Sequence, residues 1–79
     1  MKRHWVDTTV AEAYEVVKDM ESRWYLEIEI HDQWEPVVAI GPSPEGYVLT
    51  APDRFNSLFE LKSGRFHFTG TEPMRLAFG

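Results

Sequence analysis

The stretch Trp24-Tyr25-Leu26-Glu27-Ile28-Glu29-Ile30-His31 decides the fold of this chain. Apolar and polar side chains alternate in it from Leu26 to His31. Alternation with a period of two is typical of a strand that buries one face and exposes the other. The sequence therefore predicts a strand with an acidic outer face, followed by a turn at His31-Asp32-Gln33.

A helix is expected before this strand. Asp7-Thr8-Thr9 is a helix-start signal, and Thr9 with Glu12 fits a capping box, although Thr8 is an equally good cap. Apolar residues then recur at three- and four-residue intervals, at Val10, Ala13, Tyr14, Val17 and Met20. The other side of this helix carries a carboxylate row, broken only by Lys18, that consists of Glu12, Glu15 and Asp19.

Further strands are predicted after the turn. Residues 37–40 form an apolar strand, and Pro36 marks its beginning or an edge of the sheet. Residues 41–46 are expected to be an irregular connection into a strand at residues 47–50. Residues 51–64 fit helix or strand, with a strand at 58–62 and a hairpin turn at 62–65 favoured.

The last part of the chain predicts two more strands. One covers residues 65–69 with Phe66 and Phe68 inward, and a turn at residues 70–73 leads to a final strand marked by Met74, Leu76 and Phe78. The elements together predict an α+β fold with a single domain over residues 1–79. In it, one N-terminal amphipathic helix is packed on an antiparallel sheet of four to six strands.

Composition limits the function classes. The chain has 79 residues, 43% of them apolar, and no cysteine, which excludes disulfides and cysteine-ligated zinc. Its apolar runs are short, so we expect neither a membrane span nor a secretory signal, and a cytoplasmic location. The net charge is −5, and residues 7–45 alone carry −8. Such a charge repels nucleic acid and favours encounter with a cationic protein surface.

The sequence carries no catalytic motif. Three histidines, His4, His31 and His67, lack the spacing of metal ligands, so we expect no metal, no cofactor and no enzymatic activity. One alternative stays open, in which His31 beside Asp32 acts as an acid–base pair in a small enzyme.

Tryptophans and carboxylates together predict a protein-binding surface. Of Trp5, Trp24 and Trp34, one or two are expected to be partly exposed; Trp24 is assigned to the core and Trp34 to the surface. Exposed tryptophan beside charge is typical of binding hot spots. The predicted partner-binding residues share one outer wall of the molecule and are Glu12, Glu15, Asp19, Glu27, Glu29, Asp32 and Trp34.

A small, acidic, cysteine-free chain with a capped helix leading into acid-edged strands resembles phage-encoded anti-CRISPR proteins, in particular inhibitors of a type I system. The resemblance rests on the carboxylates Glu12, Glu15, Asp19, Glu27, Glu29 and Asp32. It implies a non-enzymatic inhibitor that docks on the guide-RNA surveillance complex and covers the basic residues that recruit target DNA, without contacting nucleic acid itself. The alternative is a small structural or assembly protein, either a phage component or a homodimer.

Overall fold

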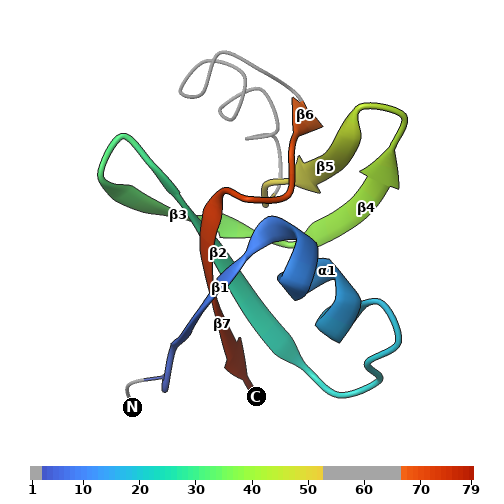
Figure 1. Ribbon diagram of the computed structural model, residues 1–79. Coiled ribbons are helices and arrows are strands. Elements are labelled where there is room, and N and C mark those ends of the chain that lie inside the picture. Colours follow the sequence, from blue (N-terminus) through green and yellow to red (C-terminus); the bar gives the residue numbers. More distant parts are fainter. Residues whose placement is uncertain (1–2, 53–66) are drawn as a thin grey trace.

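The computed structural model describes residues 3–52 and 67–79 (Figure 1). Its elements, in chain order, are β1 (Val6–Thr9), α1 (Val10–Val17), β2 (Trp24–Ile30), β3 (Gln33–Val37), β4 (Ala39–Ser43), β5 (Gly46–Thr50), β6 (His67–Phe68) and β7 (Pro73–Phe78). Within these residues, the expectation of an N-terminal helix with antiparallel strands is confirmed, and the helix is short.

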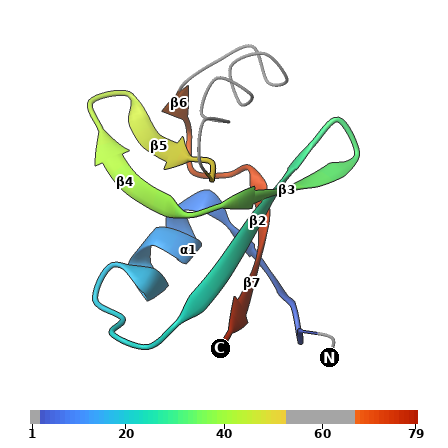
Figure 2. The same cartoon turned by 180° about the vertical axis from the view of Figure 1, so that it is seen from behind.

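The strands form two sheets in place of the single sheet expected. The first has the order β1-β7-β2-β3 and the second the order β4-β5-β6, and every pairing is antiparallel. In the first sheet β7 lies between β1 and β2, so that the two ends of the described chain are side by side (Figures 1 and 2). The seven strands also exceed the predicted four to six, because the sequence does not reveal β1 and because residues 33–43 supply two strands.

The helix begins where its capping signal predicts. The Thr9 side chain accepts a hydrogen bond from the Glu12 backbone N–H at 3.3 Å, with Thr9 in extended backbone. The Glu12 carboxylate accepts from the Thr8 hydroxyl at 3.4 Å, which brings both candidate threonines into the cap. The helix ends at Val17, three residues before the last apolar position of the predicted stripe, Met20.

A turn between β6 and β7 supports the start of the helix. The backbone N–H groups of Val10 and Ala11 donate to the carbonyl oxygens of Glu72 and Gly70, at 3.1 and 2.9 Å. The Glu72 carboxylate in turn accepts from the backbone N–H groups of Thr69 and Gly70, at 2.8 and 2.9 Å. Burial acts to raise the pKa of Glu72, but these bonds outweigh it, so that the pKa lies below its usual value.

The predicted strand at residues 24–31 is present as β2, which ends at Ile30. The turn predicted at residues 31–33 is also present, with Gln33 already in β3. Ile30 pairs with Gln33, so His31 and Asp32 are the whole loop of the β2–β3 hairpin. Their φ angles are 51° and 64°, as a two-residue hairpin turn of type I′ requires. Histidine and aspartate tolerate this left-handed region better than most side chains.

The connection at residues 41–46 was predicted wrongly. Residues 39–43 form β4, and Ser43 pairs with Gly46 across a two-residue loop. Pro42 fits into this strand because β4 is an edge strand of its sheet, where a missing N–H costs little. Pro36 lies within β3, which is the edge strand of the other sheet. This agrees with the prediction that Pro36 marks an edge of the sheet rather than the beginning of a strand.

The strands predicted in the last part of the chain fall partly within the described residues. The final strand is present as β7, and Phe68 in β6 is 2% exposed, as expected for an inward side chain. The strand predicted at residues 58–62, the turn at 62–65 and the inward position of Phe66 lie outside the described residues.

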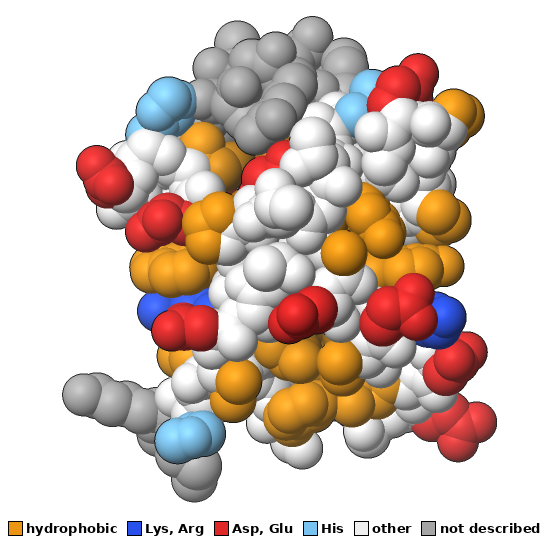
Figure 3. Space-filling model, viewed as in Figure 1, with side chains coloured by type: hydrophobic (Ala, Val, Ile, Leu, Met, Phe, Trp, Pro, Cys, Tyr) orange, Lys and Arg blue, Asp and Glu red, His pale blue; other side chains and the backbone are white. Residues whose placement is uncertain are grey.

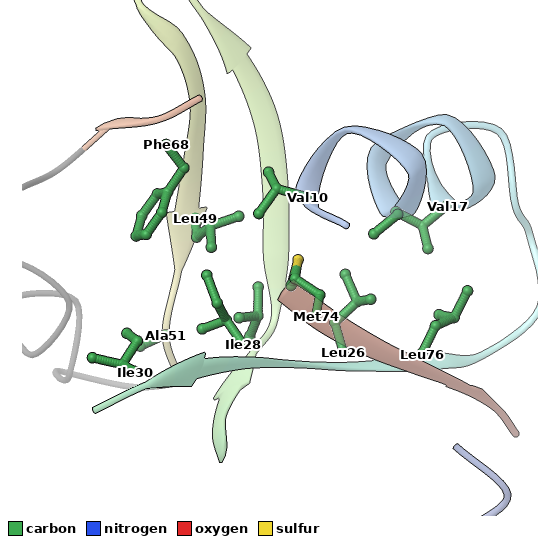
Figure 4. Packing of buried hydrophobic residues seen from close by; sticks show 12 residues of the cluster. Val10, Val17, Leu26, Ile28, Ile30, Leu49, Ala51, Phe68, Met74 and Leu76 are labelled. Atoms are coloured by element: carbon green, nitrogen blue, oxygen red, sulfur yellow. The ribbon is translucent and has the colours of Figure 1, made fainter. Parts of the chain in front are cut away.

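One hydrophobic cluster joins the helix to both sheets. Figure 4 shows Val10 and Val17 of the helix pointing toward Met74, Leu26 and Leu76 of β7 and β2. Phe68 and Leu49 of the second sheet belong to the same cluster. Its buried members are Val10, Ala13, Val17, Leu26, Ile28, Ile30, Val37, Leu49, Ala51, Phe68, Met74 and Leu76. Trp24 is partly buried against it, in agreement with its assignment to the core. The even-numbered side chains of β2 are therefore inside.

Candidate functional site

The alternation in β2 gives the first sheet an outer face. Leu26, Ile28 and Ile30 are buried in the core, and side chains at alternate positions of a strand point to opposite sides. Glu27 and Glu29 therefore lie on the side of the sheet away from the core. We call this side the outer face.

A row of paired residues crosses the outer face. Arg75 of β7 lies opposite Asp7 of β1 on one side and Glu27 of β2 on the other, and Glu27 lies opposite Pro36 of β3. The Nε atom of Arg75 donates to Glu27 Oε1 at 2.7 Å, and its NH2 group donates to the same oxygen. Only 27% of the Arg75 side chain and 23% of the Glu27 side chain are exposed. Glu27 is thus committed to an internal ion pair.

Two tryptophans enclose the same arginine. The Arg75 guanidinium lies 4.6 Å from the ring centroid of Trp5 and 4.4 Å from that of Trp34. Both distances are within the range of cation–π attraction. Trp5 precedes β1 and Trp34 belongs to β3, so the stack of Trp5, Arg75 and Trp34 spans the whole sheet. Both indoles are half-buried and present part of their surface to solvent.

A second group of cation and ring lies at the start of β2. The Arg3 guanidinium is 3.7 Å from the ring centroid of Tyr25. The guanidinium group of Arg23, and then that of Arg3, lowers the pKa of Tyr25, because a nearby donor with a positive charge stabilises the phenolate. The outer face therefore combines three half-buried aromatic rings with arginines.

The carboxylates of the helix are elsewhere. Val10, Ala13 and Val17 face the core, and Glu12, Glu15 and Asp19 are exposed on the remaining surface of the helix. This row, which we call the helix row, includes an ion pair between Glu15 and Lys18 at 2.8 Å. The hydrogen bond with Glu15, together with the charge of that carboxylate, raises the pKa of Lys18.

The single acidic wall expected from the sequence does not form. The helix row and the outer face with Glu27 and Glu29 lie on opposite sides of the first sheet, because the helix and the even-numbered residues of β2 share the core. Asp32 is exposed in the hairpin turn at the end of that sheet. In Figure 3, acidic side chains are spread from one margin of the view to the other, with hydrophobic side chains between them.

Of the predicted partner-binding residues, the outer face brings together only Glu27, Glu29 and Trp34. Glu29 lies opposite Trp34 in the β2–β3 pairing, and Trp34 contacts the arginine that binds Glu27. The assignment of Trp34 to the surface is correct in part, since the residue is half-buried. All three tryptophans, rather than one or two, retain partial exposure.

The acid–base alternative finds limited support. A hollow of about 240 Å³ is lined by His31, Glu29 and Glu72, among others, but Asp32 does not line it. The Glu72 carboxylate is occupied by the backbone of residues 69 and 70. His31 and Asp32 instead form the two-residue loop of the β2–β3 hairpin.

A second histidine contacts a hydroxyl and a carboxylate. His67 Nδ1 lies 3.1 Å from the Ser43 hydroxyl and 3.5 Å from a carboxylate oxygen of Glu45. Both partners share one ring nitrogen, whereas a Ser-His-acid relay uses both nitrogens. Within residues 3–52 and 67–79, no group of three or more His, Asp or Glu side chains has the arrangement of a metal site.

Comparison of the chain with protein-family models, curated proteins and solved structures finds no match. No helix in the described part of the chain has the length and apolar character needed to cross a membrane. The site must therefore be interpreted from its own chemistry.

Sequence reasoning did not find Arg3, Tyr25 and Arg75 as members of this surface. Tyr25 had a usable signal, because it alternates with Leu26 on the same strand as Glu27 and so falls on the outer face. Arg75 alternates in the same way between Met74 and Leu76. The alternation does not reveal the order of the strands in the sheet. That order makes Arg75 the neighbour of Glu27.

Proposed function

We propose that this chain is a non-enzymatic binding protein that docks on a larger protein or ribonucleoprotein complex through the outer face of its first sheet. The observation that carries the proposal is the stack of Trp5, Arg75 and Trp34 across that face. Tryptophan, tyrosine and arginine are the residues most enriched among binding hot spots. Here the core does not need them, because the helix and the second sheet bury the other face of the strands.

The ion pair beneath the rings favours binding. It fixes the Arg75 side chain between the two indoles, so that the three groups are ordered before a partner arrives. A preorganised surface loses less conformational entropy on association than a mobile one. Glu29 beside Trp34 supplies an exposed carboxylate at the rim of the same surface.

The helix row has a different part in this proposal. Glu12, Glu15 and Asp19, on a helix packed over the inner side of the sheet, contribute to a net charge of −5 that steers the molecule toward a basic partner. We retain as the partner a basic, nucleic-acid-binding surface such as that of the type I CRISPR surveillance complex, with target DNA recruitment blocked. A cytoplasmic location, in the host cell if the chain is phage-encoded, belongs to the same proposal.

Binding of labelled target DNA to a purified type I surveillance complex tests the proposal. The wild-type chain is expected to abolish DNA binding at one to a few molecules per complex, and Trp34→Ala is expected to weaken this at least tenfold. Val48→Ala is the matched control, because Val48 is also exposed, at 37%, but lies on the second sheet. Circular dichroism verifies that both variants are folded.

Three outcomes separate the parts of this proposal. Undisturbed DNA binding at saturating protein would refute the surveillance complex as the partner. Inhibition that Trp34→Ala leaves intact, and that Glu15→Lys removes, would assign docking to the helix row instead of the outer face. A concentration-dependent dimer in sizing chromatography that Trp34→Ala dissociates would favour the homodimer, with the outer face as its interface.

A further inference from the structure

The first sheet has a hollow beside β2, past the end of β3, that shares Trp5 and Glu27 with the docking surface and otherwise has its own lining. Strand β3 ends at Val37, opposite Leu26, so Trp24 and Tyr25 have β7 on one side and, among the described strands, none on the other. The resulting hollow has a volume of about 680 Å³. This size is within the range of small-molecule sites.

Two arginines line this hollow without an acidic partner. Arg3 and Arg23 both line the hollow together with Tyr25, and the Arg3 guanidinium lies over the Tyr25 ring at 3.7 Å from its centroid. Neither arginine forms an ion pair within 4.0 Å in the described part of the chain. No carboxylate of the described residues therefore neutralises either guanidinium group.

The carboxylates of the hollow do not neutralise these arginines. Glu27 lines the same space, but its carboxylate is bound to Arg75. Glu21 also lines it and is exposed, without an ion pair to either arginine among residues 3–52 and 67–79. The lowered pKa of Tyr25 is consistent with a local excess of positive charge. The walls around the cations are aromatic and aliphatic and include Trp5 and Val38.

We propose that Arg3 and Arg23 bind an oxyanion, a carboxylate or a phosphate, whose apolar body lies in the hollow against Trp5 and Val38. A guanidinium group binds either oxyanion with two parallel hydrogen bonds, and two such groups at one point give four donors. The oxyanion gives both cations the anionic partner that the described residues do not supply. The site does not depend on the docking proposal, since it needs no macromolecular partner.

Titration of the isotope-labelled full chain tests the site. Phenyl phosphate and phenylacetate are the probes, at constant ionic strength, and the indole N–H signal of Trp5 and the side-chain Nε–H signals of Arg3 and Arg23 are the readouts. We expect saturable shifts of these signals with at least one probe. Inorganic phosphate is expected to bind at least fivefold more weakly, because it has no apolar body to fill the hollow.

Three variants and one control test whether Arg3, Arg23 and Tyr25 determine the binding of the probe. Arg23→Gln and Arg3→Gln are each expected to weaken the better probe at least tenfold. Lys18→Gln is the matched control, because it removes one positive charge from the helix, away from the hollow. Tyr25→Phe keeps the ring beneath Arg3 and removes the competing hydroxyl, so binding is expected to be equal or tighter.

Several results would overturn the site. Shifts that grow linearly with every probe, or that Lys18→Gln reduces as much as Arg23→Gln does, would show general charge attraction only. A tenfold loss in Tyr25→Phe would show that the arginines serve the tyrosine and not a ligand. If one arginine variant fails to fold, as judged by its spectrum, the other variant decides alone. Because the titration contains no partner, failure here leaves the docking proposal standing, and the reverse also holds.

Discussion

The ion pair between Glu27 and Arg75 gives the sharpest prediction, because the sequence suggests that Glu27 is free for a partner and the structure shows it engaged. A double-mutant cycle with Glu27→Gln, Arg75→Met and the combined variant measures the coupling. Methionine keeps the apolar stem of Arg75 between the two tryptophans and removes the charge and the donors.

The magnitude follows from the geometry. Two unit charges about 4 Å apart interact by about 4 kcal/mol at an effective dielectric constant near 20, and by far less when exposed. Since 27% and 23% of the two side chains are exposed, we expect a coupling of about 1–2 kcal/mol. Arg75→Met should cost about 2–4 kcal/mol in total, because it also loses two ring contacts worth about 0.5–1 kcal/mol each.

Urea unfolding followed by far-UV circular dichroism measures these values without relying on tryptophan fluorescence. The double variant should be only slightly less stable than Arg75→Met alone. For a domain of this length each kcal/mol lowers the melting temperature by about 4–8 °C. The pair Glu15 and Lys18 is the internal control, because its side chains are 62% and 38% exposed and its coupling should be too small to resolve.

Additive effects of Glu27→Gln and Arg75→Met, within about 0.5 kcal/mol, would refute the reasoning. In that case the pairing of Glu27 with Arg75 would contribute nothing to folding stability. A coupling that disappears in 0.5 M salt would have the same meaning, because a partly buried pair is screened less than an exposed one.

Three further predictions concern the turns. Gly46→Ala should destabilise the chain by about 3 kcal/mol or more in urea unfolding, because the φ of Gly46 is +140° and a Cβ would lie 2.2 Å from the carbonyl oxygen of Phe68. Gly41→Ala is the control and should change stability by less than about 1 kcal/mol, because a Cβ at Gly41 would have no atom within 4 Å. Equal losses in the two variants would count against the hairpin. The pKa of Glu72 is lowered in the folded state, so its ionised carboxylate stabilises the folded chain at pH values above 4.5, the usual pKa. This contribution to stability is lost as the pH falls below 4.5 and through the pKa of the folded state. Glu72→Gln should therefore cost about 0.5–1 kcal/mol at pH 7 and little at pH 3, and a loss independent of pH would contradict this origin. Asp32→Gly should raise stability by about 0.5–1 kcal/mol, since glycine adopts a φ of 64° without strain, and a loss would show that the carboxylate has a structural partner.

The elements that depend on local signals could be predicted. The cap at Thr9, the strand from Trp24 to Ile30 and the turn at His31 are properties of a few adjacent residues. The failures are also local in origin. Pro42 argued against a strand at residues 39–43, and only the edge position of β4 makes that proline acceptable.

The candidate site was predicted less well than the fold. Trp34 was singled out, and the structure places it on the outer face. Its most important neighbour, Arg75, lies 41 positions further along the chain and becomes a neighbour only because β7 is inserted between β1 and β2. The expected acidic wall failed for the same reason, since no local pattern tells on which side of the sheet the helix lies.

What the sequence determined by itself is therefore the type of each well-signalled element and which side of each strand is apolar, because both depend on the spacing of side chains along one segment. The tertiary structure decided which polar faces share a surface, because that depends on strand order and on where the helix is placed. The same carboxylates that appear as one acidic series in the sequence are divided by the sheet into an exposed helix row and a Glu27 held by Arg75.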